Sequence, residues 1–566
     1  MSKLSRIKKK MTRLFGTAIE CREWRSSIVL EGIVNSWEQV VAAGNLAAGK
    51  GYKGVVNRIE VKGLPTERIR KPDWRDHHLN QRRVDVLVIG GGIIGSAIIR
   101  ELAKWELSVL LVDKEGDLAM HTSSRNDGMI HPGLLPKPGS RKAYFNVRGN
   151  ELYSRVTKEL NVDFTRPGSF ILYDQWAMKL LYPLIKLRAR RNKVKDLRLI
   201  GRDELQQLEP GLAPEIRGAL YIPSAGVLSP YKMTIAYAEN AVANGAEVSL
   251  NTMVEAMEKK GDEITAVKTN RGKVFPRIII NAAGVFSDVI ADLAGDQFFT
   301  IHPRKGEIIL LDRKKGELIK AIYSRPEFNR IKGSSKGGGI IKTIEGNVLI
   351  GPDAYEQPYR EDFTTNRENI LALLERFLPI FPELSAKDVI TYFSGIRAAT
   401  YEEDFIIEKS EYVQNLIHAA GIQSPGLASA PAIAEEIEKL TLELLSGQKR
   451  VKARVGWNPV RKAIPELSKM GARSRGELIR KKPAYGEIVC RCEEISRGEV
   501  IDALQSPIPA TTLDAIKRRV RAGMGRCQGE FCTPLLIKIM EEEGFDIMEI
   551  TKKGNNSYLL LEETKG

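Results

Sequence analysis

Cysteines and long apolar stretches are scarce in this chain, and each scarcity excludes a class of protein. Five cysteines in 566 residues are too few for the disulfide framework of a small secreted protein. No apolar run approaches the roughly 18 residues that a membrane-spanning helix requires. The start, residues 1–15, is basic but lacks the apolar core of a secretory signal. We therefore expect a cytoplasmic globular protein.

Acidic residues are fewer than basic ones, 71 against 87, so the formal net charge is +16. Such an excess occurs in nucleic-acid-binding proteins, but no nucleic-acid motif accompanies it here. Lysine and arginine are spread along the chain apart from clusters at residues 8–10 and 188–195. Dispersed positive charge also attracts a small anionic substrate or an acidic protein partner. We predict no nucleic-acid partner and interpret the N-terminal cluster as a solvated arm.

The length predicts two to four domains, and shifts in composition give their boundaries. Residues 1–83 comprise the basic arm, a small module and a polar linker. Residues 84–445 alternate short apolar strands with helices, which predicts an α/β core with a second sheet inserted. Residues 446–485, rich in Lys and Arg, form a second linker, and residues 486–566 carry a cysteine cluster.

The small N-terminal module occupies residues 27–62, which are predicted to form a strand, an Ala-rich helix and a second strand. Asn35 followed by Glu38 resembles the capping box of a helix start. The stretch resembles a BON domain, a β-α-β module that occurs in other proteins at membrane surfaces or with ligands. The resemblance implies a docking or packing module, and it adds peripheral membrane association to the expectations.

A dinucleotide-binding motif follows the first linker. The apolar strand at residues 84–89 runs into three spaced glycines and then a helix. Gly90 permits the tight turn, Gly92 lets the backbone approach a pyrophosphate, and Gly95 lets the helix pack close to the strand. A second strand, residues 107–112, ends at Asp113, where a carboxylate accepts hydrogen bonds from ribose hydroxyls. Strand, glycines, helix, strand and acid in this order predict dinucleotide binding.

The segment after this acid favours FAD over NAD. Residues 121–133 are rich in glycine and hydroxyl side chains, as befits backbone contacts around a cofactor. Over residues 84–440 the chain resembles the FAD-dependent oxidoreductase family that includes D-amino-acid oxidases, L-2-hydroxyglutarate dehydrogenases and glycerol-3-phosphate dehydrogenases. The turns at residues 280–284 and 421–431 carry the resemblance further.

This resemblance implies an α/β, Rossmann-like FAD-binding fold with an inserted substrate-domain sheet. The turn at 421–431 is expected to direct a helix N-terminus at the flavin, where the helix dipole stabilises negative charge. A residue at a strand end in the inserted region, Val254, matches a family position that contacts adenine through its backbone. The cofactor contacts expected beyond the glycine motif are Ser123, Ser124, Val254, Gly284, Gly421 and Gly426.

Two residues are candidates for substrate chemistry. Arg397 matches the family arginine that holds a substrate carboxylate or phosphate, because a guanidinium forms two parallel hydrogen bonds to such an anion. His131, one of six histidines, matches a polar family position close to the flavin and is a candidate proton acceptor. Arg125, Arg304 and Lys305 are further basic candidates, which either line the site, shield cofactor phosphates or lie in solvent.

The C-terminal cysteines predict a metal centre. Cys490 and Cys492 are followed, after two predicted helices at residues 496–504 and 513–522, by Cys527 and Cys532. Four thiolates suit a [2Fe–2S] cluster or a tetrahedral zinc ion, and reduced free thiols are the remaining alternative. The stretch resembles the [2Fe–2S] module of bacterioferritin-associated ferredoxins, which also ends the large subunits of anaerobic glycerol-3-phosphate dehydrogenases. The resemblance implies the cluster.

Together, flavin and cluster imply a dehydrogenase, since a simple oxidase needs no one-electron outlet. The expected partner is a second flavoprotein or another electron-acceptor subunit. From residue 84 onward the chain looks most like the anaerobic glycerol-3-phosphate dehydrogenases, which implies oxidation of sn-glycerol 3-phosphate to dihydroxyacetone phosphate. Residues 137–143 look more like the 2-hydroxyglutarate dehydrogenases. A 2-hydroxy acid, an amino or imino acid, and an electron-relay subunit without substrate chemistry therefore stay open as alternatives.

Overall fold

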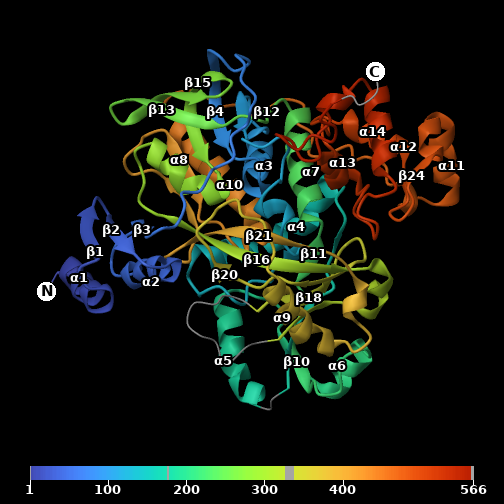
Figure 1. Cartoon of the computed structure of the whole chain (residues 1–566), viewed down its shortest axis with the longest axis horizontal. Coiled ribbons are helices and arrows are strands. Elements are labelled where there is room, and N and C mark those ends of the chain that lie inside the picture. The colour runs from blue at the N-terminus through green and yellow to red at the C-terminus, as the bar shows by residue number, and fades with distance from the viewer. Residues whose placement is uncertain (1, 175–176, 326–336, 563–566) are drawn as a thin grey trace.

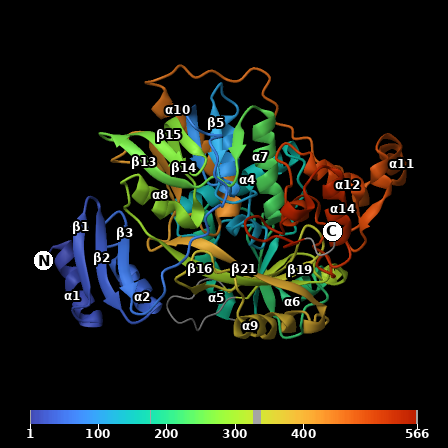
Figure 2. The same cartoon turned by 45° about the horizontal axis from the view of Figure 1, so that its top comes forward.

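A computed structural model describes residues 2–174, 177–325 and 337–562. The N-terminal module lies at one side of a large central body, and the cysteine module lies at the opposite side (Figure 1). A turned view shows the same arrangement (Figure 2). Within the described ranges, no helix is both long and apolar enough to cross a membrane.

The central body contains the predicted α/β sheet, built around the motif strand. The motif strand and the strands nearest to it run parallel, whereas residues 254–269 and 406–409 form antiparallel strands towards the edges. In order, the strands are β12 (Glu247–Ser249), β5 (Val109–Val112), β4 (Arg82–Ile89), β15 (Gly272–Asn281), β14 (Glu263–Thr269) and β13 (Val254–Lys260), with β23 (Leu416–Ala420) beside β15 and β22 (Ile406–Lys409) beside β23.

Helices cover both faces of this sheet. On one face, apolar side chains of β4 and β15 share a core with α3 (Ile93–Leu102), α4 (Arg141–Glu159), α7 (Pro230–Ala243) and α10 (Gly426–Leu445). The short helix α8 (Ser287–Leu293) packs on the other face. This is the Rossmann-like arrangement that the sequence predicts, and it fixes the motif turn at the carboxyl edge of the sheet.

The inserted sheet is also present and is mainly antiparallel. It joins β20 (Tyr355–Glu356), β16 (Ile301–Leu311), β19 (Val348–Gly351), β18 (Gly339–Lys342), β17 (Ile322–Ser324), β8 (Ser169–Tyr173), β10 (Gly218–Ile222) and β9 (Arg198–Gly201), with β21 (Val389–Thr400) along β16. Its outer elements are α5 (Ala177–Arg191), α6 (Arg202–Leu208) and α9 (Arg367–Phe377). A small sheet of β6 (Met129–Ile130), β11 (Gly226–Leu228) and β7 (Phe164–Thr165) adjoins it.

The N-terminal module is larger than predicted. Strands β2 (Ser27–Val34) and β3 (Val55–Val61) and helix α2 (Trp37–Ala47) lie where the sequence places them, and β1 (Ile19–Trp24) adds a third strand. The basic start is not a solvated arm, because it forms helix α1 (Lys3–Phe15). Its Ile7 and Met11 are buried against the sheet. Three consecutive lysines, residues 8–10, separate these two apolar residues and obscured the helical spacing in the sequence.

Both predicted linkers are held to the central body by polar contacts. In the first, Glu67 accepts backbone hydrogen bonds from residues 360 and 361, and Asp76 pairs with Arg271. In the second, Arg454 donates to two backbone carbonyls beside α3. The second linker also contains helix α11 (Ala472–Lys481), which the sequence analysis did not predict.

The cysteine module has its own small core of three helices. They are α12 (Arg497–Leu504), α13 (Leu513–Val520) and α14 (Thr533–Glu542), and a short hairpin joins β24 (Ile488–Cys490) to β25 (Ile495–Ser496). The first two helices match the predicted pair to within two residues. A capping box of Ser496 and Glu499 begins α12.

Candidate active site and four-cysteine site

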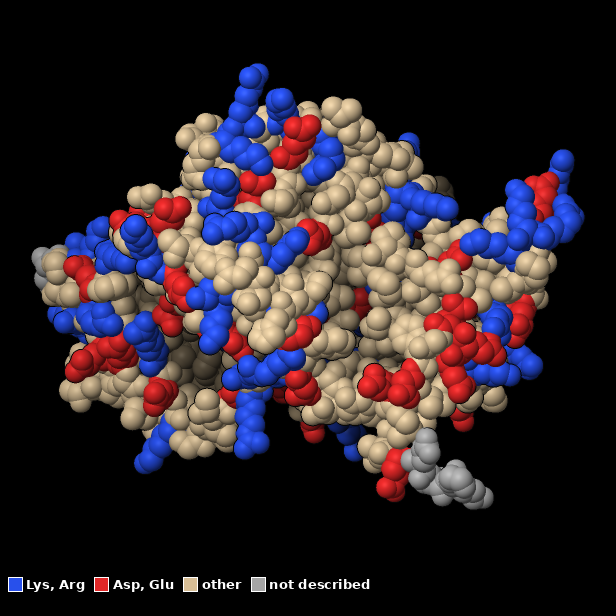
Figure 3. Space-filling view, turned by 90° about the horizontal axis from the view of Figure 1, so that it is seen from above, with Lys and Arg blue, Asp and Glu red and all other residues tan. Residues whose placement is uncertain are grey.

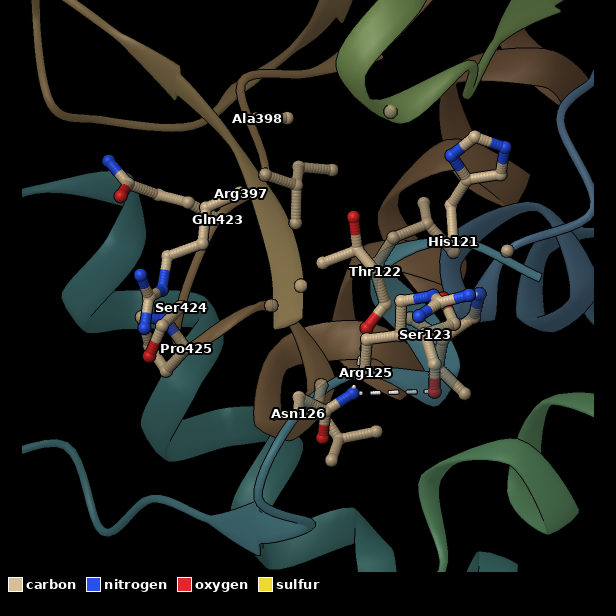
Figure 4. Close-up of a pocket in the computed structure, with 18 of the residues that line it drawn as sticks. His121, Thr122, Ser123, Arg125, Asn126, Arg397, Ala398, Gln423, Ser424 and Pro425 are labelled. Carbon is tan, nitrogen blue, oxygen red and sulfur yellow. Dashed lines mark hydrogen bonds between the residues drawn. The ribbon is translucent and has the colours of Figure 1, made fainter. Parts of the chain in front are cut away.

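A cavity of about 470 Å³ opens between the two large sheets. Its walls come from chain segments between residues 69 and 427, so it forms only when the central body is folded. The volume lies in the range typical of small-molecule and cofactor sites. Figure 4 shows Arg397, Gln423, Ser424 and Pro425 on one side, with the segment from His121 to Asn126 on the other.

The glycine turn forms one end of this cavity, and its backbone leaves no room for side chains. Gly90 has a φ of +116°, and an added Cβ would meet the Ala282 carbonyl oxygen at 2.4 Å. A Cβ on Gly95 would lie 1.9 Å from the Gly90 oxygen, which explains the close packing of α3 on β4. Gly92 is the N-cap of α3 and lines the cavity, so the helix N-terminus and its dipole are directed at the cavity. This cradle fits a pyrophosphate.

Asp113 lies in the same wall, at the end of β5. Its two carboxylate oxygens accept hydrogen bonds from the N–H groups of Gly91, at 2.5 Å, and Glu115, at 2.8 Å. Burial, and then the nearby Glu115 charge, raise the pKa of Asp113. Glu115, His121 and Glu361 also converge here, but Arg70 and Lys114 pair with the two carboxylates. We interpret this second group as a salt-bridge cluster.

The other expected cofactor residues fall into two groups. Those that line the cavity are Ser123, Val254, Gly284 and Gly426. Gly95, Ser124 and Gly421 are not in its wall. Ser123 Oγ accepts a hydrogen bond from the Ile93 N–H at 2.8 Å and so fastens the start of α3.

Val254 differs from the expectation in its setting. It is the first residue of β13 in the dinucleotide sheet, whereas the sequence analysis placed it at the end of a strand in the inserted region. Gly421, with a φ of +64°, instead shapes the turn that leads into α10. Gly426 is the first residue of α10, and Pro425 before it supplies no side-chain cap. The N-terminus of this 20-residue helix therefore lies at the cavity wall, where the Gly426 N–H donates to the Gln423 carbonyl oxygen at 2.7 Å.

Arg397 projects from β21 into the cavity, and its positive charge is only partly neutralised there. Its guanidinium donates to two backbone carbonyls, Asp353 O at 2.9 Å and Lys305 O at 3.4 Å, and forms no ion pair within the described ranges. A Cβ on Gly306 would lie 2.7 Å from the guanidinium, so glycine is needed there. Burial, and then the Arg304 charge, lower the pKa of Arg397. A cation in this setting favours an anionic ligand.

His131 lies on the same cavity wall, in the strand-turn that follows β6. Its Nε2 is 3.4 Å from Ser424 Oγ, and its carbonyl oxygen accepts hydrogen bonds from Asn146 at 2.7 Å and Asn150 at 3.1 Å. The backbone is therefore fixed while the ring faces the cavity. The structure brings His131 and Arg397 into one site, as predicted from the sequence.

The further basic candidates are only partly in this site. Arg304 and Lys305 point away from the cavity and pair with acids, Arg304 with Glu356 and Glu403, and Lys305 with Asp362. Both are therefore structural cations. Arg125 does line the cavity and lies over the Phe363 ring at 4.3 Å.

Sequence reasoning missed two polar residues of the substrate end. Arg325 lines the cavity and pairs with Asp174, and Gln423 accepts a hydrogen bond from Arg304 at 3.3 Å. Gln423 lies within the turn at 421–431, but its direction depends on the tertiary fold. No local motif marks Arg325, because it follows the short strand β17 of the inserted sheet.

The four C-terminal cysteines meet at one place in the cysteine module. Cys490 and Cys492 have their sulfurs 3.7 Å apart, and Cys492 lies 3.9 Å from Cys527. Cys532 joins them through a side-chain hydrogen bond with Cys490. A Cβ on Gly525 would lie 2.3 Å from the Cys492 sulfur, so this glycine preserves the space around the thiols. Four unbridged thiols in one cradle fit a thiolate-ligated cluster. Cys21 is buried in the distant N-terminal module.

Buried ion pairs join the cysteine module to the flavin-side domain. Asp117, in the loop after β5, accepts hydrogen bonds from Arg518 at 2.6 Å and Arg519 at 3.1 Å, both on α13. Arg521 donates to Glu493 beside the cysteines at 2.8 Å and to Tyr231 of α7 at 3.0 Å. The loop after β5 continues into the cavity wall, so the two sites share one connected region.

Comparisons with known proteins match both domains. Residues 85–440 match the model of the FAD dependent oxidoreductase family, and residues 488–542 match the BFD-like [2Fe-2S] binding domain. A glycerol 3-phosphate dehydrogenase of Caloramator mitchellensis is 37% identical over 85% of this chain and 99% of its own length. An anaerobic glycerol-3-phosphate dehydrogenase subunit A1 of Haloferax volcanii is 26% identical over 79% of this chain and 81% of its own.

A solved structure shows the same fold of the central body. The dithionite-reduced L-α-glycerophosphate oxidase of Mycoplasma pneumoniae, with FAD bound, aligns with a TM-score of 0.62 and 27% identity. The alignment covers 68% of this chain and all of that one. The chain belongs to the FAD dependent oxidoreductase family and ends in a BFD-like domain, so it is an FAD enzyme with a [2Fe–2S] cluster.

Proposed function

We propose that this enzyme is a dehydrogenase that oxidises sn-glycerol 3-phosphate to dihydroxyacetone phosphate. The observation that carries the proposal is Arg397, a cation in the cavity wall held by carbonyl oxygens and without a carboxylate partner among the described residues. A phosphate dianion would supply the missing negative charge through two parallel hydrogen bonds. The similar glycerol 3-phosphate dehydrogenase of Caloramator mitchellensis supports this choice of anion.

The cofactor would lie along the glycine turn, with Gly90 and Gly92 at its pyrophosphate, Asp113 at its ribose and Gly426 at its ring. Ser123, Val254 and Gly284 complete the cavity wall, while Gly95 and Gly421 shape the two turns that form it. FAD bound there supplies an acceptor for two electrons from a substrate carbon.

The protein residues orient the substrate and move one proton. Arg397 would hold the phosphate, and this would fix the position of the carbinol carbon in the cavity. His131 would accept the hydroxyl proton at Nε2, the nitrogen that faces Ser424. The N-terminus of α10 would stabilise negative charge that develops on the ring.

The thiolates of Cys490, Cys492, Cys527 and Cys532 would hold the [2Fe–2S] cluster, which would supply a one-electron outlet to a second flavoprotein or another electron-acceptor subunit. Cys527 is half-buried, and Phe531 between Cys527 and Cys532 is 76% exposed, so the thiol site reaches the module surface. The similar Haloferax volcanii protein is itself a subunit, which supports a multisubunit arrangement.

Anaerobic mixing with candidate substrates tests the proposal. We expect sn-glycerol 3-phosphate to bleach the flavin absorbance within seconds, and L-2-hydroxyglutarate or L-proline to leave it unchanged. Faster bleaching by one of the acids would assign the cavity to that acid. If no small anion bleaches the flavin, the chain is an electron-relay subunit and the proposal is wrong.

A further inference from the structure

Helix α5 exposes an apolar stripe where a surface helix normally exposes polar residues. Leu180 and Leu184 are 67% and 66% exposed, and Leu187 and Leu181 are 46% and 40% exposed. Residues 180, 184 and 187 are four and three positions apart, so they lie on one face of the helix. At the periphery of the inserted sheet, α5 lies away from both terminal modules (Figure 1).

The charge on this helix is of one sign. Residues 177–195 contain seven lysines and arginines and no aspartate or glutamate. Lys179, Lys186, Arg190 and Arg191 form no ion pair with any residue that the structure describes, and all four are exposed. An apolar stripe flanked by unpaired cations is complementary to a layer that has an apolar interior and negatively charged groups at its surface.

The opposite face of α5 is fixed to the rim of the cavity. Met178 and Ala189 are buried in a core with Leu134. Arg188 Nε donates to the Leu134 carbonyl oxygen at 3.1 Å, and Asn192, just after the helix, donates to the Gly133 carbonyl oxygen at 2.9 Å. Since residues 133–136 line the cavity, these contacts hold α5 in a fixed orientation relative to the cavity wall.

Two other basic helices of this chain show what is particular to α5. Helix α1 carries six cations, but its Ile7 and Met11 are buried against its own sheet, and Leu14, next to the helix end, is its one exposed leucine. Helix α11 projects from the cysteine module, and Figure 3 shows its cations at the right edge of the molecule. Its Leu478 and Ile479 are only half-exposed, so it lacks an open apolar stripe. Of these three helices, α5 alone combines unpaired cations with a stripe of several exposed leucines.

We propose that α5 is a docking surface for an anionic phospholipid bilayer. Lying in the plane of the interface, this 15-residue helix would extend about 22 Å along the bilayer. Its leucines would enter the acyl boundary, and the flanking lysines and arginines would contact lipid phosphates. The inference does not depend on which substrate the cavity binds.

Vesicle sedimentation of the holoenzyme tests this surface. We expect binding to vesicles of phosphatidylglycerol and phosphatidylcholine in equal parts, and little binding to phosphatidylcholine alone, at about 0.1 M salt. The triple variant L180S/L184S/L187S should bind at least about tenfold more weakly, because its apolar stripe is lost. Its flavin absorbance and substrate bleaching should equal those of the wild type.

Matched controls separate the stripe from general apolarity and general charge. L208S/L371S removes two exposed leucines from α6 and α9, and R473Q/R475Q/R480Q removes three cations from α11; neither should change vesicle binding by more than about twofold. In the wild type, hydrogen exchange of residues 177–191 should slow on anionic vesicles, while α11 should not change. Absence of wild-type binding, or binding that the triple variant retains, overturns the proposal. Binding that salt abolishes but that the leucine substitutions do not affect would show that charge alone drives it, and it would equally overturn the proposal.

Discussion

The cavity and the four-cysteine site solve the same problem, holding a redox group, by opposite means. The cavity is assembled from segments spread between residues 69 and 427 and lies between two large hydrophobic cores. The cysteine site comes from one short stretch of a module with a single small core. A large core sets the cavity walls without help from a ligand, whereas a small module needs additional cross-links for stability. We therefore expect loss of the cluster to unfold the module, and loss of FAD to leave the central body folded.

A substitution of Arg397 is expected to have the largest effect, and to affect the cavity but not the four-cysteine site. Replacing this arginine with methionine keeps an unbranched apolar stem but removes the guanidinium and its charge for the substrate anion. We expect kcat/KM for sn-glycerol 3-phosphate to fall about 10³-fold, since bidentate anchoring is lost. Stopped-flow flavin bleaching measures this effect, and the cluster absorbance should not change.

The matched control for this variant is Arg304→Met. Arg304 pairs with Glu356 and Glu403 rather than facing the cavity. R304M should lower the thermal unfolding temperature, because two ion pairs are lost. It should lower the rate of flavin bleaching much less than R397M does. If R304M reduces bleaching as strongly as R397M, then Arg397 is not the anion anchor and the assignment of the substrate end is wrong.

Cys492→Ser provides the next largest effect, and on the other site. This sulfur lies 3.7 Å from Cys490 and 3.9 Å from Cys527, so its loss should prevent the cluster from assembling. We expect turnover with an artificial one-electron acceptor to fall about 100-fold, while substrate still bleaches the flavin at a rate within about twofold of the wild type. Iron analysis and the two assays measure these outcomes.

A serine at the buried Cys21 is the control, because that thiol lies in the N-terminal module. C21S should keep its iron, its bleaching rate and its acceptor turnover. Should C492S slow flavin bleaching as much as acceptor turnover, the two sites would not be separable and the comparison would fail.

The cysteine site could be predicted more completely from the sequence than the cavity, because its residues lie in one stretch of the chain. The glycine turn and the cysteines are local patterns, in which each spacing is set by one turn or one ligand geometry, so Gly90 and Cys527 were found directly. Arg325 and Gln423 were missed because the inserted sheet and the turn before α10 direct them into the cavity only in three dimensions. Helix α1 was missed because its lysines outnumber the residues of its buried stripe.

The junction between the sites gives a smaller effect. Asp117 is buried and neutralises two arginines of α13, so Asp117→Asn leaves both cations without a carboxylate. We expect the module to lose about 3 kcal/mol of stability relative to the central body. Limited proteolysis should then cut within residues 486–566 before the central body. Asp163→Asn, which removes a half-exposed partner of Lys469, should change the cleavage rate little. Equal sensitivity of both variants would show that the module is not held by the buried pairs.

The smallest effect belongs to two adjacent carboxyls at the end of β21 and depends on pH. Burial raises the pKa of Glu402 to about 7. The folded protein then binds a proton at Glu402 that the unfolded chain releases above its ordinary pKa, so stability falls as pH rises from about 4.5 to 7. Glu402→Gln should therefore raise the stability of the central body at pH 8 by roughly 1 kcal/mol and flatten this slope.

Glu403 is the matched residue, because its pKa is shifted in the opposite direction. Burial alone would raise its pKa, but the Arg304 charge lowers the pKa of Glu403 to about 2. Its contribution to stability is present above the ordinary carboxyl pKa and is lost as pH falls through about 2, so Glu403→Gln should destabilise the protein at pH 8. Thermal unfolding from pH 5 to 8, monitored separately by flavin and by cluster absorbance, measures both variants. Only the flavin transition should move, because both carboxyls belong to the central body. A shift of the cluster transition in either variant would show that the two sites unfold as one unit, and it would contradict the separation between the cavity and the cysteine module.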